Sequence, residues 1–412
     1  MRICMVTSEF PPKWGGVGNG VYFQAKVFAE RGYKITVITR KQLKGMKPLD
    51  VHPNVNVVEV DWLKLPMFFT TSFGDHAVKE ILERGEDYDV VHVHSNMTLL
   101  RRKHYGRLPY PIVSTLHGTW KGERQELKLS YINPTSLQSL NDLAIMVISP
   151  LFDKYEDYAI ELSNAVIVES LSEEEAVKRR GVENIYGRMY RVPAGVDIGS
   201  FRPGNRDERV FEKYSIMGEL KLLTVTRLAG RKGMDLLLDS FARVKREVDG
   251  AVLVVVGEGP QEKKLKRLVR RLGVEEAVYF LGSVPFEDLK RLYATADLFV
   301  FHSRWEGQGL VILESMASGT PCVSSNVGGV REMIRQGVDG YYVDVGDTAG
   351  MAKRIVELLK NPERREEMAQ LGMERIRSEW SWQRIAERYD VIYKEIMDDD
   401  ISIRAEAARG RK

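Results

Sequence analysis

Residues 298–325, LFVFHSRWEGQGLVILESMASGTPCVSS, decide the fold class of this protein. The stretch opens with the apolar run LFVFHS and closes with TPCVSS, and both runs predict strands. Residues 310–317 between them predict a helix, so the order is strand, helix, strand. Two consecutive strands joined by a helix run parallel and are covered by that helix. The stretch therefore indicates an α/β fold built on a parallel sheet.

Comparable strand-like runs recur along the chain. In the first half they are RICMVTS (2–8), ITVIT (35–39), VVHVH (90–94), PIVSTLH (111–117) and AVIVES (165–170). In the second half they are LKLLTVTRL (220–228), AVLVVVGEG (251–259), VYFLGSV (278–284), LFVFHS (298–303), TPCVSS (320–325) and GYYVD (340–344). Because these runs are apolar on both faces and alternate with helical segments, we predict two doubly wound, Rossmann-like domains in tandem.

The length of 412 residues also favours two domains, since one hydrophobic core rarely serves more than about 250–300 residues. The segment 191–209 is rich in Gly and Pro and lacks helical periodicity, so we place the hinge at 197–206. Residues 1–200 are assigned to an N-terminal domain and residues 201–380 to a C-terminal domain. A last helix is expected over 381–397, and the charged segment 398–412 is expected to be disordered.

Composition restricts the partners and the compartment. The formal net charge of +3 is small for this length, so nucleic acid is not an expected partner. The first residues lack the apolar stretch of a signal peptide, and no segment approaches the roughly 20 apolar residues that cross a bilayer. Cys4 and Cys322 lie far apart in apolar runs and predict buried, reduced thiols. We expect a cytoplasmic protein, and peripheral contact with the inner membrane face stays open.

Glu306 and Glu314 flank the start of the helix predicted at 310–317. Gly307 and Gly309 let the backbone approach a ligand, and the free amides of a helix start bind anions such as phosphate. Glu306 in the loop can reach a sugar, while Glu314, two turns along the helix, can accept hydrogen bonds from ribose hydroxyls. A capping acid and an ordinary surface acid are the alternative when each Glu is taken alone.

Two cations follow the strand predicted at 220–228. Arg227 lies at its end, and Lys232 with Gly233 precedes a helix. The carboxyl ends of parallel strands gather ligands, so we expect both cations to neutralise a diphosphate without a metal. A solvated basic loop is the alternative.

The N-terminal half offers two further candidates. Gly15 and Gly16 belong to a glycine loop that opens a helix and suits a phosphate. Residues 9–14 separate this loop from the first strand, so a dinucleotide-binding fingerprint is not expected. His117 ends a strand and can donate a hydrogen bond to a sugar hydroxyl, or it is a structural histidine.

Three polar clusters receive a structural interpretation. His92 and His94 alternate on one strand with no third metal ligand evident nearby in the sequence, and we expect them to pack. Asp87–Asp89 precede a strand and read as a turn. The basic run 101–107, RRKHYGR, is interpreted as a solvated loop, with contact to an anionic acceptor or to lipid head groups as the alternative.

Taken together, these segments resemble the retaining glycosyltransferases of family four, which have the GT-B fold. The likeness covers nearly the whole chain and includes VPAGVD (192–197), TRLAGRKG (226–233), GEGP (257–260), YFLGSV (279–284) and EWSWQRIAERY (379–389). Its most specific motif is the pair of Glu306 and Glu314, which are separated by seven intervening residues as in that family's pattern.

The resemblance implies two domains that face a central cleft, with the acceptor bound by the first and the nucleotide sugar mainly by the second. It implies that the final helix returns to the N-terminal domain. The residues implied to bind the donor are Gly15 and Gly16 in the N-terminal loop, Arg227 and Lys232 at the diphosphate, Val284 at the base, Glu306 at the sugar, Gly309, Leu310 and Val311 at the phosphates, and Glu314 at the ribose. His117 would complete the site. Gln308, Thr226 and Ala194 replace a usual aromatic, glycine and asparagine, and Gln308 leaves the donor sugar open.

We therefore expect a metal-independent, retaining glycosyltransferase of carbohydrate biosynthesis that needs no cofactor. It would move a hexosyl group from a UDP-, GDP- or ADP-sugar to a hydroxyl of a saccharide, a lipid-linked acceptor or a small molecule. The catalytic residues would be Glu306, His117, Arg227 and Lys232. One alternative is a nucleotide-sugar epimerase on the same architecture, and another is a non-catalytic protein that binds a sugar nucleotide or a glycan.

Overall fold

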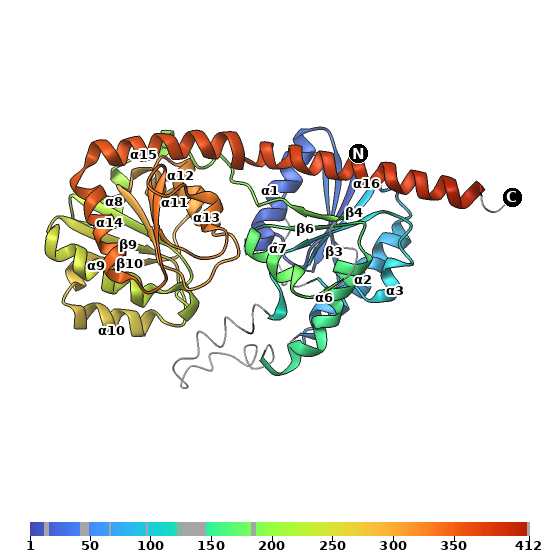
Figure 1. Ribbon diagram of the computed structural model, residues 1–412, viewed down its shortest axis with the longest axis horizontal. Coiled ribbons are helices and arrows are strands. Elements are labelled where there is room, and N and C mark those ends of the chain that lie inside the picture. The colour runs from blue at the N-terminus through green and yellow to red at the C-terminus, as the bar shows by residue number, and fades with distance from the viewer. Residues whose placement is uncertain are drawn as a thin grey trace. The chain divides into compact units, whose positions relative to one another are not determined.

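The chain folds into two compact units (Figure 1). The computed structural model describes residues 1–11, 16–41, 49–65, 67–95, 98–121, 124, 146–182 and 187–409. Within this part of the chain, the first unit holds the strands up to Ala194 together with the helix that begins at Trp382, and the second unit holds Gly195–Ser381. The boundary between Ala194 and Gly195 lies a few residues before the predicted hinge.

A parallel seven-stranded sheet forms the centre of the first unit. Its order is β3-β2-β1-β4-β5-β6-β7. The strands are β1 (Arg2–Val6), β2 (Lys34–Arg40), β3 (Val55–Val60), β4 (Val90–Ser95), β5 (Ile112–Leu116), β6 (Ala165–Val168) and β7 (Met189–Arg191). The five predicted strands are present. The sequence interpretation missed β3 and β7, which are the two edge strands, and both are only partly buried.

The helices of the first unit are α1 (Gly16–Glu30), α2 (Phe68–Arg84), α3 (Arg102–Tyr105), η1 (Ser149–Phe152), α6 (Asp153–Leu162), α7 (Leu171–Lys178) and α16 (Trp382–Arg409). The C-terminal helix α16 packs on α1, where the rings of Tyr389 and Tyr393 both lie 5.8 Å from the ring of Phe28. Tyr33 donates a 2.8 Å hydrogen bond to Asp390 of α16, and Arg31 pairs with the same carboxylate. This end of the chain is thus part of the first unit.

Helix α16 also differs from the expectation for the tail. It continues past Asp398 to Arg409, where the sequence predicted a disordered segment. Ala, Glu and Arg, which favour helices, are frequent after residue 403, so the charged composition does not interrupt the helix. Residues 410–412 lie outside the described residues.

The second unit is built on a parallel six-stranded sheet with the order β10-β9-β8-β11-β12-β13. The strands are β8 (Leu220–Val225), β9 (Ala251–Val256), β10 (Val278–Gly282), β11 (Leu298–Phe301), β12 (Cys322–Ser325) and β13 (Gly340–Val343). All six predicted strands are present, which confirms the doubly wound α/β class. The direction of strand order reverses between β8 and β11, and ligands of such sheets bind outside the carboxyl ends of the strands at this switch point.

Helices cover both faces of the second sheet. They are η2 (Pro203–Asn205), α8 (Arg209–Lys213), η3 (Gly230–Lys232), α9 (Met234–Glu247), α10 (Glu262–Leu272), η4 (Glu275–Ala277), α11 (Phe286–Thr295), α12 (Leu310–Ala317), α13 (Val330–Met333), α14 (Thr348–Lys360), α15 (Pro362–Arg375) and η5 (Ile376–Trp380). Helix α9 packs against α10 and α14, while α12 packs against α11 and α15.

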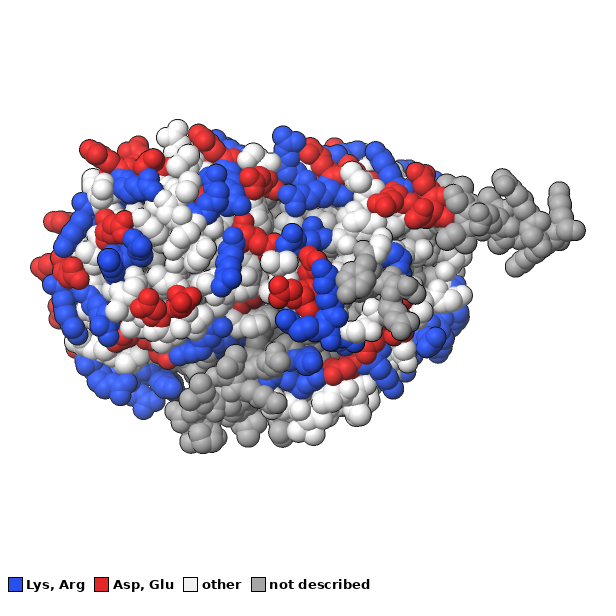
Figure 2. Space-filling model, in the orientation of Figure 1, with Lys and Arg blue, Asp and Glu red and all other residues white. Residues whose placement is uncertain are grey.

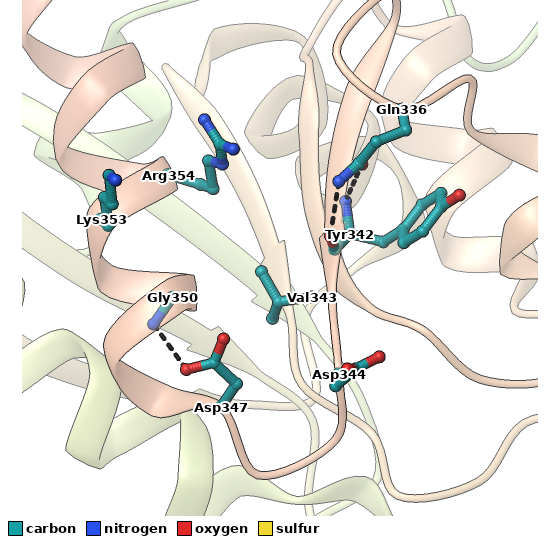
Figure 3. Close-up of a pocket in the computed structure, with 8 residues that line it drawn as sticks. All are labelled: Gln336, Tyr342, Val343, Asp344, Asp347, Gly350, Lys353 and Arg354. Carbon is teal, nitrogen blue, oxygen red and sulfur yellow. Dashed lines mark hydrogen bonds between the residues drawn. The ribbon is translucent and has the colours of Figure 1, made fainter.

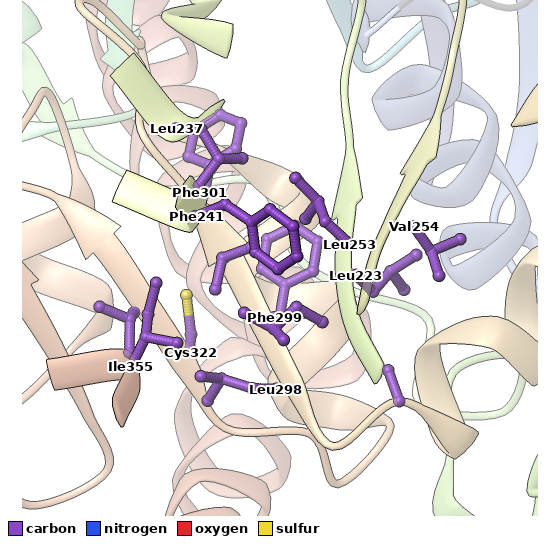
Figure 4. Close-up of a cluster of buried hydrophobic side chains, with 14 of the residues drawn as sticks. Leu223, Leu237, Phe241, Leu253, Val254, Leu298, Phe299, Phe301, Cys322 and Ile355 are labelled. Carbon is purple, nitrogen blue, oxygen red and sulfur yellow. The ribbon is translucent and has the colours of Figure 1, made fainter. Parts of the chain in front are cut away.

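Apolar strand residues and the inner sides of these helices form one continuous core in the second unit, part of which is drawn in Figure 4. Phe299 and Phe301 of β11 stack with ring centroids 6.3 Å apart, and Phe241 of α9 is buried in the same core. Cys322 is buried there and Cys4 is buried in the first unit, so both predicted free thiols are confirmed. Among the described residues, no helix combines the length and the apolar character needed to cross a bilayer.

Candidate functional site

The switch point of the second sheet carries an ion pair between two predicted site residues. Lys232 ends η3, after β8, and Glu306 lies in the loop after β11. Lys232 Nζ lies 2.5 Å from Glu306 Oε1, and the two side chains retain only 14% and 8% of their exposure. A buried charge requires a close partner, so each of these groups fixes the position of the other. The structure therefore brings together the predicted diphosphate-binding cation and the predicted sugar-binding acid.

A second ion pair, which the sequence interpretation missed, joins the same two loops. Arg304 follows β11, and its guanidinium donates two 2.7 Å hydrogen bonds to the carboxylate of Asp235 at the start of α9. The same guanidinium donates to Gly230 O at 3.0 Å, and the Arg304 amide donates to Arg231 O at 2.8 Å. Such a two-point contact fixes orientation as well as distance. Arg304 thus holds the loop of Lys232 against the loop of Glu306.

Two glycines allow these loops to pack backbone to backbone. Gly233 has a φ of 58°, and a Cβ there would lie 1.8 Å from His302 O. Gly328 has a φ of 50°, and a Cβ there would lie 1.9 Å from Glu306 O. The next amide, of Gly329, donates to Gly307 O at 3.0 Å. The glycine pair at 328 and 329, which the sequence predicted to be a structural turn, therefore supports the loop that carries Glu306.

The start of α12 has the geometry of an anion site. Gly309 is its N-cap residue with a φ of 93°, and it has no side chain to accept a hydrogen bond from the first amides. The backbones of Leu310 and Val311 follow directly, and both residues are half-buried. Amides and the helix dipole at such a start favour a negative charge. The predicted phosphate position is therefore available next to Glu306.

Glu314 lies on α12 and contacts α11. Tyr293 donates a 2.8 Å hydrogen bond from its hydroxyl to Glu314 Oε2. Burial raises the pKa of Glu314 to about 7, although the hydrogen bond from Tyr293 acts in the opposite direction. A further hydroxyl donor, such as a ribose, would favour the charged form of this carboxyl.

Arg227 and Val284 stand on loops that are supported by the segment 257–260. Arg227 is exposed just beyond β8, and Val284 is half-buried just beyond β10. A Cβ on Gly257 would lie 2.0 Å from Thr226 O, and Ser283 N donates to Glu258 Oε1 at 3.2 Å. This segment therefore packs closely against the loops of both predicted donor-binding residues.

In the first unit, His117 uses both of its ring nitrogens within the protein. Its Nδ1 lies 3.1 Å from Glu169 Oε2, and its Nε2 lies 3.0 Å from His94 Nδ1. His94 and His92 are buried, and their rings stack with centroids 4.3 Å apart. The predicted packing role of these two histidines is confirmed. His117 can therefore donate a hydrogen bond to a sugar hydroxyl only if it gives up its contact with Glu169 or with His94.

Gly16 is the first residue of α1 in the first unit, while Gly15 lies outside the described residues. Asp89 accepts a 2.7 Å hydrogen bond from the backbone amide of Arg2 at the start of β1. Asp87 and Asp89 thus lie directly before β4, in agreement with their interpretation as a turn.

A surface pocket of about 360 Å³ lies elsewhere, between the edge strand β13 and the start of α14 (Figure 3). It is lined by Gln336, Tyr342, Val343, Asp344, Asp347, Gly350, Lys353 and Arg354, and it includes none of the predicted site residues. Gln336 pairs with the backbone of Tyr342 at 2.8 and 2.9 Å, so its amide protects the sheet edge. The chemistry of the switch point makes that position, rather than this pocket, the candidate site.

Comparison with protein families gives two matches that together span most of the chain. Residues 14–200 match the model described as Glycosyltransferase Family 4, and residues 206–375 match the model of the glycosyl transferases group 1. Over 406 residues the chain is 29% identical to the N-acetyl-alpha-D-glucosaminyl L-malate synthase of Bacillus anthracis, covering 94% of this chain and 96% of that protein. Over 411 residues it is 30% identical to an uncharacterized glycosyltransferase of Methanocaldococcus jannaschii, covering 97% and 99%.

Solved structures give the same fold. Sucrose-phosphate synthase from Thermosynechococcus elongatus matches with a TM-score of 0.76 at 20% identity, covering 97% of this chain and 99% of that chain. HepE of Anabaena, solved in complex with UDP and glucose, matches with a TM-score of 0.69 at 19% identity, covering 96% and 100%. At these identities the likeness concerns the fold, and it confirms the GT-B class that the sequence predicted.

Proposed function

The chain belongs to the glycosyltransferases of family four, and on this premise we propose that it transfers a hexosyl group from a nucleoside-diphosphate sugar to an acceptor hydroxyl with retention of configuration. The observation that carries the proposal is the buried pair of Lys232 and Glu306 at the switch point of the second sheet. The complex of HepE with UDP and glucose supports a nucleotide sugar as the donor class.

In the proposed site, positive charge and backbone amides hold the diphosphate. Lys232 and Arg227 would neutralise it, and the amides at the start of α12 would contact it. Because Lys232 already stands 2.5 Å from Glu306, the diphosphate and the donor sugar would be bound side by side. Glu306 would accept hydrogen bonds from sugar hydroxyls, and Glu314 would accept them from the ribose.

The proposed reaction breaks the bond between the anomeric carbon and the diphosphate oxygen. The acceptor oxygen forms the new bond on the face that the diphosphate leaves, and the departing phosphate takes the proton of the acceptor hydroxyl. Negative charge grows on the diphosphate as the bond breaks, so fixed cations lower the barrier. The same cations can replace a divalent metal in this role, which is why we propose a metal-independent reaction.

The first experiment is a thermal-shift panel with UDP-, GDP- and ADP-sugars, in the presence and absence of a chelator. A donor that binds only the folded state raises the melting temperature, and the proposal expects one nucleotide class to do so equally with the chelator present. Incubation of that donor with candidate acceptors should then yield a glycosylated product. Isomerisation of the donor alone would identify an epimerase, and binding without any turnover would identify a non-catalytic protein.

A further inference from the structure

The first unit exposes a cluster of large apolar side chains, called here the apolar patch. Its members are Leu63, Leu65, Phe68, Val147 and Leu151, and each retains between 48% and 67% of its exposure. Single exposed apolar residues are common on protein surfaces, but neighbouring ones mark an interaction surface.

The apolar patch consists of two segments, 63–68 and 147–151, and their contacts show that they are neighbours. Phe68 begins α2, and its ring packs edge-on against Phe152 of η1 with centroids 5.6 Å apart. Phe152 follows Leu151 directly, and Val147 lies four residues before Leu151. On the other side, the amide of Leu63 donates to Ser72 Oγ of α2 at 2.9 Å, which holds the loop 63–65 beside the start of that helix.

Buried residues beneath the apolar patch fix it in place. Met67, Leu99, Trp120 and Phe152 form a separate small core. Met67 has a φ of 64°, a left-handed conformation that residues with a side chain rarely adopt, and it is buried directly before exposed Phe68. The outward position of Phe68 is therefore set by the packing of its neighbour.

Five cations lie on the segments that carry the apolar patch, on α6, or on and directly after α3, which packs against α6. They are Lys64, Arg102, Lys103, Arg107 and Lys154, all exposed. Lys154 lies over the ring of Tyr155 and Arg102 over that of Tyr158, so both belong to the surface formed by α6 and α3. Asp75 of α2 is paired with Arg101, and Asp153 of α6 is paired with Arg124. Within the described residues, none of the five cations has an ion pair.

We propose that the apolar patch and its five cations dock on the surface of an anionic phospholipid bilayer. The apolar side chains would enter the boundary between head groups and acyl chains, and the cations would contact the lipid phosphates. This combination favours a membrane over a purely polyanionic partner, because a polyanion would contact the cations and leave the five apolar side chains exposed to water. The inference concerns where the enzyme works and does not depend on the donor chemistry proposed above.

Helix α10 of the second unit provides a matched comparison. It exposes Lys263, Lys264, Lys266, Arg267, Arg270 and Arg271, and Figure 2 shows Lys and Arg gathered where α10 lies in Figure 1. Its apolar residues Leu265 and Val269 are buried in the core of the unit, and Leu268 and Leu272 are half-buried against that core. Helix α10 therefore offers charge without exposed large apolar side chains, and it should bind a bilayer less strongly than the apolar patch does.

The test is co-sedimentation of the full chain with vesicles of phosphatidylcholine, with and without phosphatidylglycerol. We expect binding only to the anionic vesicles, with a loss at high salt, since each cation near such a surface contributes about a five-fold gain. The double variant Leu65→Asp with Leu151→Asp should reduce binding at least about ten-fold. Lys64→Glu with Lys154→Glu should do the same, whereas Lys263→Glu with Arg270→Glu, an equal change of charge, should reduce it less than about two-fold.

Three outcomes would overturn the proposal: failure to bind either vesicle, equal losses from the two charge-reversal pairs, or full binding by the Leu variants. Self-association that the Leu variants abolish, without vesicle binding, would assign the apolar patch to a second copy of the chain instead. The melting temperature of every variant is measured first. Leu65→Ser with Leu151→Ser replaces the Asp pair if that pair melts early, because both positions are exposed and tolerate a polar residue.

Discussion

Lys232 Nζ lies 2.5 Å from Glu306 Oε1, and this contact links the loop after β8 to the loop after β11. In the proposed function both groups bind the donor, Lys232 at its phosphates and Glu306 at its sugar. A pair that is already formed orders both loops and compensates both charges in a mostly buried position. Removal of one partner therefore leaves the other charge without compensation, and this affects stability as well as activity.

Lys232→Ala is expected to lower turnover by a factor of about 10²–10³, because a cation that stabilises the leaving diphosphate is lost. It should also lower the free energy of unfolding, and adding Glu306→Gln should restore part of that loss by removing the unpaired carboxylate. Turnover and urea denaturation measure the two effects. Lys263→Ala on exposed α10 is the control, and near-normal turnover in the Lys232 variant would refute the assignment.

Asp235→Asn and Arg304→Lys are expected to lower turnover about ten-fold although neither residue is assigned to the donor, because the loops of Lys232 and Glu306 lose their two-point connection. Burial alone would raise the pKa of Asp235, but the hydrogen bonds and charge of Arg304 outweigh it and hold this pKa below its usual value. Steady-state kinetics and the melting temperature are measured together. An effect on melting without any effect on turnover would give the pair a purely structural role.

The second sheet was predictable because its six strands are apolar on both faces. The edge strand β3 was missed since VNVVEV is only half-buried and alternates weakly, and β7 has only three residues. At the site, Glu306, Lys232 and the start of α12 were found because each follows a strand at its carboxyl end. The pair of Arg304 and Asp235 had no periodic signal, since 69 positions separate the two residues. The rule that the carboxyl ends of neighbouring parallel strands lie side by side would have predicted that these two residues are close, since β8 and β11 are neighbours.

Gly328→Ala is expected to destabilise the second unit by more than about 2 kcal/mol, since its Cβ would overlap Glu306 O at 1.9 Å in a left-handed backbone. Gly346→Ala is the matched control, because that position also has a positive φ, 89°, but nothing lies within 4 Å of the added Cβ. We expect about 1 kcal/mol there from backbone strain alone. Equal losses in the two variants, measured by urea denaturation, would show that the contact with the Glu306 loop contributes nothing.

Glu314→Gln is expected to change the pH dependence of stability. Burial raises the pKa of Glu314 to about 7 from an ordinary value of 4.5, so the folded protein binds this proton more tightly than the unfolded chain does. The contribution of this proton to the free energy of unfolding is therefore fully present below pH 4.5. It is lost as the pH rises through 7, by at most about 3 kcal/mol.

The Gln variant cannot ionise, so its stability should exceed that of the natural protein at pH 8 and approach it at pH 4.5. Glu156, whose pKa burial also raises to about 7, is present in both proteins and cancels in the comparison. Urea denaturation at both pH values measures the difference. A difference that does not vary with pH would contradict the assignment of this proton to Glu314.

His94 and His117 are expected to form one fixed arrangement of ring hydrogen bonds. The carboxylate of Glu169 stands 3.1 Å from His117 Nδ1, which favours a proton on that nitrogen, so that Nε2 accepts a hydrogen bond from His94 Nδ1. Burial lowers the pKa of His92 to about 3 and holds that of His94 well below its usual value, so both rings stay neutral at neutral pH. Nitrogen-15 NMR of the ring nitrogens tests this pattern directly.

Glu169→Ala should release the Nδ1 proton preference of His117 and lower stability by about 1–3 kcal/mol, as for the loss of a hydrogen bond to a charged group. Glu169→Gln is the control, because its amide oxygen can still accept from Nδ1–H and should preserve the ring orientation. If His117 orients a sugar, the Ala variant should raise KM for the donor more than it lowers kcat, and the Gln variant should do neither. Protonation of His117 at Nε2 in the unaltered protein would contradict this order of hydrogen bonds. In that case His94 Nδ1 would have to accept the hydrogen bond, and the buried Nε2 of His94 would carry a proton without a partner.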